Sequence, residues 1–143
     1  ANELRTLLEK ELAKAHIEAK FTWDIGATEN EMQEALLLIR QAQWRWDFGV
    51  SSHGGSFHAP QETMRILGHG LNKVFQARML ISKVLVAHGY TDNVPLPDIT
   101  TKEKAQQYIG LDMAVEKADK DKFLKEIVPE WLQKAKANGR IVN

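Results

Sequence analysis

The sequence contains no cysteine among its 143 residues, and this absence excludes several kinds of chemistry. Without a thiol the chain has no disulfide, no cysteine–zinc site and no thiolate nucleophile. It also lacks C-x-x-C-H, the motif through which c-type haem is attached covalently. We therefore expect neither thiol chemistry nor a covalently attached haem from these residues alone.

An excess of one charge and long apolar runs are also missing. The 19 basic residues balance the 19 acidic ones, so the formal net charge is zero. A neutral chain has no overall attraction to nucleic acid or to an anionic membrane, and we expect no nucleic-acid partner. No stretch approaches the roughly 20 consecutive apolar residues that a transmembrane helix needs.

Apolar residues spaced three and four apart are abundant, and this is the pattern of amphipathic helices. We predict helices over residues 2–20, 28–50 and 60–88. The last of them would be roughly 40 Å long at 1.5 Å per residue. No strand pattern or internal repeat is visible, so the predicted fold class is all-α, with no separate domains within residues 1–143.

Signals for helix ends support these boundaries. Thr28 followed by Glu31 is a capping-box signature at the start of the second helix. Pro60 suits the first turn of the third helix, where its missing N–H costs nothing. Gly89 suits the C′ position at the end of the same helix.

The carboxy-terminal third begins with a proline-punctuated connector, Val-Pro-Leu-Pro. Thr100 or Thr101 can cap a short helix that follows it. Asp112 can cap a last helix, and Pro129 falls inside the apolar pattern of that helix. We predict a kink or break at Pro129, because proline removes a backbone hydrogen bond from the helix interior.

The third helix carries a seam of side chains with the spacing of a coiled coil. Its members are Met64, Leu67, Leu71, Val74, Arg78, Ile81 and Leu85. We expect this seam to be buried. Gly68 and Gly70 each weaken the helix by about 1 kcal/mol relative to Ala, which indicates that a large group approaches the backbone there.

The second helix is apolar on two sides. Its main stripe consists of Met32, Ala35, Leu36, Ile39, Ala42, Trp46 and Gly49, and the side chains off this stripe are Leu37, Trp44 and Phe48. A helix with two apolar sides is buried on both, so we expect neighbours that this chain lacks. Two tryptophans on opposite sides of a buried helix explain Trp44 and Trp46, although Trp46 can also lie against a flat cofactor.

His58 is the candidate ligand among the five histidines. His53 and His58 bracket a Gly-Gly loop, and stiff neighbours, Ala59 and Pro60, follow His58. A firmly held imidazole beside glycines that admit a bulky group suits a metal or haem-iron ligand. A single histidine is not a zinc site, which needs three or four ligands.

The other candidate sites have simpler explanations. His16 and His69 fit exposed helix faces, and His88 fits a helix carboxy-terminus, where a positive charge is favoured. The acids Asp24 and Glu29 fit solvated helix ends better than a cation site. No nucleophile–base pair, phosphate loop or paired-carboxylate site is visible, so we assign no catalytic residue to this chain.

Several blocks in order resemble the carboxy-terminal part of the periplasmic, ammonia-forming cytochrome c nitrite reductases. They are Gln-Ala-Gln-Trp-Arg-Trp-Asp at 41–47, Ser-His-Gly at 52–54, His-Ala-Pro at 58–60, Leu-Pro-Asp-Ile-Thr-Thr-Lys-Glu-Lys-Ala-Gln at 96–106 and Ile-Val-Pro-Glu-Trp at 127–131. The resemblance covers the chain from about residue 12 to residue 138. It implies an all-α part of a multihaem cytochrome, with long helices packed against a haem core and one long helix in a homodimer interface.

The same resemblance implies a function. His58 would be the distal axial ligand to the iron of one haem c, and both the haem c and a calcium ion would be bound upstream of this chain. The intact enzyme would be periplasmic and would reduce nitrite to ammonium with six electrons. Its electron donor would be a multihaem quinol dehydrogenase or a soluble cytochrome.

Two alternatives remain open from the residues. The apolar seam and the lack of a complete active site also fit a non-enzymatic helical module for interaction or dimerisation. A related multihaem cytochrome with another oxidant, such as hydroxylamine or sulfite, fits the same blocks. The role of His53 is left unassigned.

Overall fold

The computed structural model describes residues 2–52 and 54–141. Over these residues it consists of helices and their connections, without a strand, so the all-α prediction is confirmed. The chain divides into two compact units, Ala1–Leu96 and Pro97–Asn143. This division does not test the prediction that residues 1–143 belong to one larger protein without separate domains.

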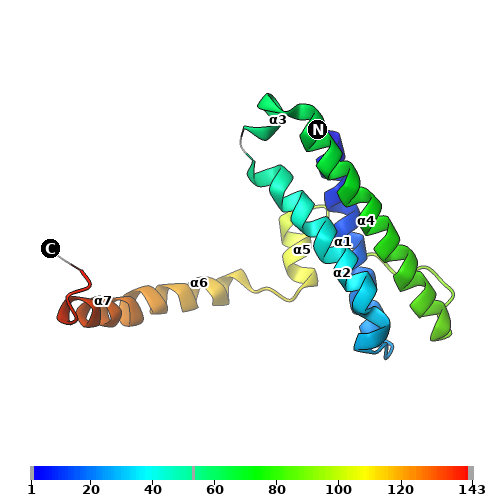
Figure 1. The fold of residues 1–143 in the computed structure, drawn as a ribbon. Helices are drawn as coiled ribbons and strands as arrows, with labels where there is room; N and C mark the ends of the chain where they lie inside the picture. The colour runs from blue at the N-terminus through cyan, green and yellow to red at the C-terminus, as the bar shows by residue number, and fades with distance from the viewer. Residues whose placement is uncertain (1, 53, 142–143) are drawn as a thin grey trace. The chain divides into compact units, whose positions relative to one another are not determined.

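The first unit is built from three long helices that pack side by side (Figure 1). They are α1 (Asn2–Asp24), α2 (Glu29–Ser51) and α4 (Pro60–Ala87), and a single turn, α3 (Gly55–His58), joins α2 to α4. Their shared core holds Leu8, Leu12, Ala15, Ala19, Ala27, Met32, Ala35, Ile39, Ala42, Leu67, Leu71, Val74, Ala77, Ile81 and Leu85. The three long helices were predicted, whereas α3 lies in a segment that the sequence indicated as a loop.

The predicted caps of the first unit are present. The Thr28 hydroxyl accepts a hydrogen bond from the Glu31 N–H, and the Glu31 carboxylate accepts one from the Thr28 N–H. Gly89 follows α4 with a φ of 80°, the left-handed conformation that favours glycine at C′. These local signals fix where α2 begins and where α4 ends.

The coiled-coil seam of α4 is buried inside this one chain. Leu67, Leu71, Val74, Ile81 and Leu85 belong to the core that α4 shares with α1 and α2. These side chains are therefore covered within the chain itself, and the expectation that one long helix lies in a homodimer interface stays a prediction. Three helices of the same chain already satisfy the apolar side chains, as the spacing alone required.

Gly70 lies where the three long helices meet. A Cβ at this position would stand 2.6 Å from Leu8 Cδ2 on α1 and 3.3 Å from Arg45 Cβ on α2. A Cβ at Gly68 would meet nothing within 4 Å. The predicted close approach therefore exists at Gly70, and the approaching groups come from this chain itself.

Arg78, the polar member of the seam, is held by two carboxylates of α1. Its guanidinium donates to Glu18 through Nε and Nη2, at 2.8 and 2.6 Å, and to Glu11 through Nη1. Lys14 adds a hydrogen bond to Glu11 at 2.7 Å. Burial alone would raise the pKa of Glu11, but the Lys14 hydrogen bond and the Arg78 charge outweigh it and lower that pKa.

The second unit contains four helical segments. They are α5 (Lys102–Tyr108), α6 (Met113–Lys122), η1 (Phe123–Ile127) and α7 (Val128–Ala137). Thr101 caps α5 and Asp112 caps α6, as two of the sequence signals indicated. The predicted disturbance at Pro129 is a π-helical turn, η1, that directly precedes α7. Just before the proline, the Val128 N–H donates to the carbonyl of Phe123, five residues earlier, whereas an α-helix would use the carbonyl four residues earlier.

None of the helices of the second unit buries a side chain. Its large exposed apolar residues are Tyr108, Ile109, Leu111, Met113, Val115, Phe123, Leu124, Ile127, Trp131, Leu132 and Ile141. Across the part of the chain that the structure describes, no helix is long and apolar enough to cross a membrane.

Candidate functional site

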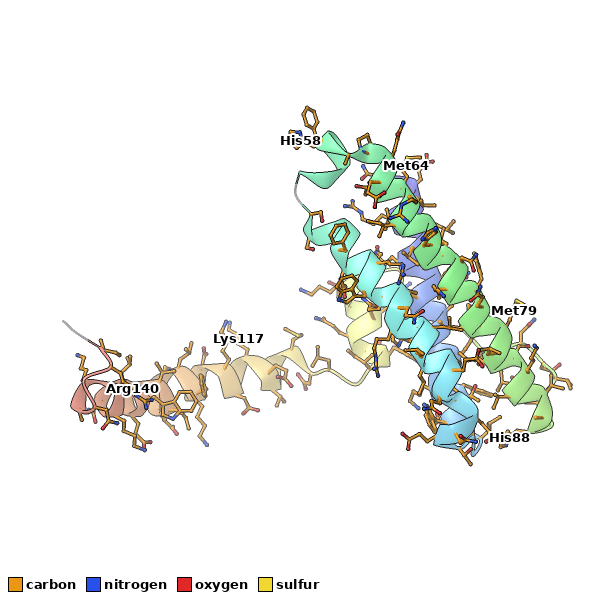
Figure 2. All side chains as sticks on the ribbon, in the orientation of Figure 1. His58, Met64, Met79, His88, Lys117 and Arg140 are labelled. Atoms are coloured by element: carbon orange, nitrogen blue, oxygen red, sulfur yellow. The ribbon has the colours of Figure 1, made fainter. Side chains whose placement is uncertain are left out.

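His58 sits at a tight corner between α2 and α4 (Figure 2). Gly54 precedes this corner, Ala59 closes it with φ −140° and ψ 61°, and Pro60 is the first residue of α4. The His58 N–H donates to the Gly54 carbonyl at 2.9 Å, and the Ala59 N–H donates to the Gly55 carbonyl at 2.9 Å. The backbone under the imidazole is therefore fixed on both sides.

The imidazole of His58 is exposed and available. Its ring meets the Phe57 ring edge to face, with centroids 5.2 Å apart, and Phe57 itself is 84% exposed. A Cβ at Gly54 would lie 3.1 Å from His58 Cδ2, so the glycine leaves room for the ring. Among the described residues we find no hydrogen bond to a ring nitrogen of His58, and an imidazole in this state can bind a metal.

The other described histidines have protein partners or face solvent. His88 Nε2 lies 3.1 Å from Glu31 Oε1, and His69 Nδ1 lies 3.5 Å from Arg65 Nη1. His16 is exposed on α1. His53, whose role the sequence left open, lies outside the described residues.

Glu31 joins two helix ends through His88. Hydrogen bonds from the Thr28 backbone and hydroxyl, followed by the contact with His88, lower the pKa of the Glu31 carboxyl below its ordinary value. The pair is a structural clamp between α2 and α4, which agrees with the helix-end interpretation of His88.

A groove between α2 and α4 was not predicted from the sequence. It has a volume of about 180 Å³ and is lined by Trp44, Arg45, Phe48, Arg65, Ile66 and His69; we call it the Arg45 groove. Trp44 and Phe48 are four apart on α2, as Arg65 and His69 are on α4, so each pair shares a helix face. Only the packing of the two helices brings the pairs together.

The second apolar side of α2 is not buried within this chain. Leu37, Trp44 and Phe48 are 50%, 71% and 43% exposed. Trp46, by contrast, packs against the core, and its Nε1 is buried without a hydrogen-bond partner among the described residues. The two tryptophans thus lie on different sides of α2, as predicted, but only one of the two sides is covered.

Nothing in the described parts of the chain builds a metal site from protein side chains alone. No three His, Asp or Glu residues converge among residues 2–52 and 54–141. His58 is thus an isolated candidate donor, without a second metal-binding side chain beside it among the described residues. What it offers chemically is one nitrogen donor on a fixed corner.

Comparison with known proteins identifies the family. Residues 1–139 match the family model of cytochrome c552. The chain belongs to the cytochrome c552 family. The family name is that of a c-type cytochrome, a class of protein that carries haem c.

Individual cytochrome c552 relatives agree with this assignment. The chain is 74% identical over 141 residues to cytochrome c-552 of Bacteroides fragilis and 71% identical over 141 residues to that of Bacteroides thetaiotaomicron. The Porphyromonas gingivalis protein is 62% identical over 142 residues. Each alignment covers 99% of this chain, but only 29%, 29% and 28% of the respective relatives.

The family name corrects the assignment made from sequence motifs. We expected the carboxy-terminal segment of an ammonia-forming nitrite reductase, whereas the family model and these relatives carry the name cytochrome c552. The blocks behind the expectation, such as His-Ala-Pro at 58–60, contain a candidate ligand and the start of a helix. Such features do not specify an oxidant, so the blocks identify a cytochrome without identifying nitrite as its substrate.

The described residues fit haem c as a ligand source and not as an attachment site. The chain has no cysteine, so it offers no thiol for the covalent links of haem c. It does offer the exposed, firmly held imidazole of His58. Neither the relatives' names nor these residues support the calcium ion that the resemblance implied.

Proposed function

We propose that this chain is a helical part of a haem-c electron-transfer protein, in which His58 supplies an axial ligand to a haem iron. The observation that supports this most is the exposed imidazole of His58, which has no hydrogen-bond partner among the described residues and lies on a fixed corner of a cysteine-free chain. The haem would be attached to another part of the same protein. The chain spans under a third of the length of the relatives that it matches, so this function of the whole protein is a proposal.

Ligation by His58 suits electron transfer. Haem iron changes its oxidation state, and two protein axial ligands leave it no open position for a substrate. The chain would supply one of these ligands and would shield part of the haem from water, which tunes the reduction potential. The proposal requires a redox partner on each side of the electron path but no catalytic residue within this chain.

Other expectations that the sequence resemblance implied stay predictions. The enzymatic activity, the periplasmic location and the particular electron donors are untested, and the proposal does not rest on them. The number of haems is equally untested. We include no calcium ion.

The test is the substitution His58→Ala in the holoprotein. Loss of an axial ligand converts one haem from the six-coordinate low-spin state to a high-spin state, which visible and electron paramagnetic resonance spectra detect. Added imidazole should restore the low-spin signal, since it can fill the vacated position. His16→Ala, on an exposed face of α1, is the matched control and should leave every haem signal unchanged.

The ligand assignment fails if His58→Ala retains all the low-spin haem of the unsubstituted protein. It also fails if imidazole does not restore a lost signal in a variant that keeps its helical content. The second result would mean that the substitution damages the corner without removing a ligand.

A homodimer is a second proposal, and the outer face of α4 supports it better than the buried seam. Met64, Phe75, Met79 and Val86 are 48%, 45%, 63% and 56% exposed, and their separations of 11, 4 and 7 residues place them on one helix face. Met64 and Met79 are labelled on α4 in Figure 2. Sedimentation of the holoprotein tests the proposal: Met79→Glu should lower the mass to that of a monomer, whereas Gln76→Glu should not. An unchanged mass for both variants would exclude this face.

A further inference from the structure

The Arg45 groove lies at the same end of the first unit as His58. Its lining comes from the last two turns of α2 and from the first turns of α4, and consists of Trp44, Arg45, Phe48, Arg65, Ile66 and His69. Ile66 is six residues after Pro60, which is about 9 Å along the helix axis. The groove and the proposed iron ligand therefore flank one corner of the molecule.

One cation of the groove, Arg45, has no acidic partner in the part of the chain that the structure describes. Arg45 Nη1 donates to the Gln41 carbonyl at 2.7 Å, and we find no carboxylate in contact with Arg45 in residues 2–52 and 54–141. Arg65, across the groove, is bound through Nε and Nη2 to the two oxygens of Glu62, at 2.7 and 2.5 Å. The Arg65 charge is balanced, whereas the partly buried Arg45 guanidinium has donors left for an anion.

The wall beside Arg45 is apolar and flat. Trp44 and Phe48 both line it, and they are 71% and 43% exposed overall. A simple anion would satisfy Arg45 but would leave both rings in water. The groove is therefore matched to a group that combines a carboxylate with a broad apolar surface.

We propose that the Arg45 groove receives a propionate edge of haem c, with Arg45 donating to the carboxylate and with Trp44 and Phe48 against the apolar ring edge. The inference rests on the proposed electron-transfer function, because that function places haem c beside this chain. Haem c presents both chemistries at one edge. Arg45 stabilises the carboxylate as an anion, and its charge favours the reduced iron, which carries one positive charge less.

The test compares Arg45→Gln with Arg40→Gln in the holoprotein. Both substitutions remove one positive charge from α2, but Arg40 is exposed and does not line the groove. Potentiometric titration should show a lower midpoint potential for one haem in Arg45→Gln only. The pH dependence of that potential should move to higher pH, because the propionate loses the cation that lowers its pKa.

Two further measurements separate the possible causes of a lowered midpoint potential in Arg45→Gln. Resonance Raman spectra should show a changed propionate bending band in Arg45→Gln and an unchanged one in Arg40→Gln. Arg45→Lys, which keeps the charge, should retain a potential close to that of the unsubstituted protein. An Arg45→Gln variant that fails to fold would lose its haem signals altogether, and circular dichroism would show the loss of helix. In that case the propionate band of Arg45→Lys is compared with that of the unsubstituted protein instead.

Each result decides the proposal. Equal potentials in Arg45→Gln and in the unsubstituted protein would overturn it. A changed potential with an unchanged propionate band would also overturn it, because the carboxylate in the groove would then belong to an acidic side chain. Failure of the His58 assignment is distinct: His58→Ala would leave the spin state unchanged while Arg45→Gln still lowers a potential.

Discussion

Arg78 shows how a single polar residue is accommodated in an otherwise apolar seam. Its side chain is 27% exposed, and those of its partners Glu11 and Glu18 are 8% and 13% exposed. Two carboxylates so close together repel one another unless a cation lies between them. The two glutamates therefore need the arginine as a counter-charge, and we call Glu11, Glu18 and Arg78 together the Arg78 cluster.

The Arg78 cluster gives a prediction for single and combined substitutions. Arg78→Met should lower the free energy of unfolding by about 2 kcal/mol, because it leaves two largely buried carboxylates without a counter-charge. Replacing all three residues, with Gln at Glu11 and Glu18, should cost no more than about 1 kcal/mol. Denaturant unfolding followed by circular dichroism measures both. A triple variant that is less stable than the single one would contradict this account.

The pKa of Glu11 adds a pH dependence to the same experiment. Because folding lowers this pKa below its ordinary value of 4.5, Glu11 stabilises the fold above that pH and loses the contribution as the pH falls further. The stability difference between the unsubstituted protein and Arg78→Met should therefore shrink below about pH 4. Asp24→Asn, which breaks an exposed pair with Lys20, should change the stability by less than about 0.5 kcal/mol at neutral pH.

At the scale of the helix, α4 contains a natural pair of test positions. Gly68→Ala should stabilise the helix by about 0.5–1 kcal/mol, because the new methyl group enters open space and alanine favours the helix. Gly70→Ala should destabilise by about 1–3 kcal/mol, since its methyl group would meet the buried Leu8 and the Cβ of Arg45.

Thermal unfolding of the two variants measures this difference directly. The positions are two residues apart in one helix, so helix propensity contributes equally to both. Equal effects would mean that Leu8 moves aside without cost and that the meeting point of the three helices is loosely packed.

The sequence predicted the long helices better than it predicted the segments between and after them. Thr28, Glu31 and Gly89 act within one turn, so their geometry follows from local sequence. The π-helical turn before Pro129 was predicted only as a disturbance, because proline excludes a regular helix without selecting its replacement. The short α3 depends on Gly54 and Gly55, which permit a loop and a turn equally.

The candidate site also has one part that the sequence predicted, His58, and one that it did not, the Arg45 groove. His58 was recognisable because its neighbours in sequence, Ala59 and Pro60, are also its supports in the structure. The Arg45 groove was not recognisable, because residues 44–48 and 65–69 meet only through the packing of α2 against α4. The seam of α4 has a related limit: its periodicity predicts a buried face but does not identify the helices that cover it, which here are α1 and α2 of the same chain.

On the scale of the whole molecule, the two units differ in how they bury apolar surface. The first has a core shared by three helices, including the fully buried Leu8 and Met32. In the second, no residue of α5, α6, η1 or α7 is buried, and Trp131 and Leu132 are 57% and 47% exposed. A segment without a core gains little free energy from folding by itself, since isolated short helices are marginal in water.

Proteolysis should therefore separate the two units when this chain is prepared alone. Trypsin should cut first within residues 97–143, where lysines such as Lys117 and Lys125 lie on helices with no buried residue, and only later within residues 2–96. The first unit offers equally good cleavage residues, such as Lys10 and Arg40, so protection there would report folding and not a lack of sites.

In the holoprotein, the apolar side chains of the second unit should be covered, and cleavage within residues 97–143 should slow. Mass spectrometry of timed digests measures both rates. Equal rates of cleavage in the two units of the isolated chain would show that the second unit is stable without further protein, and its exposed apolar residues would then need another explanation.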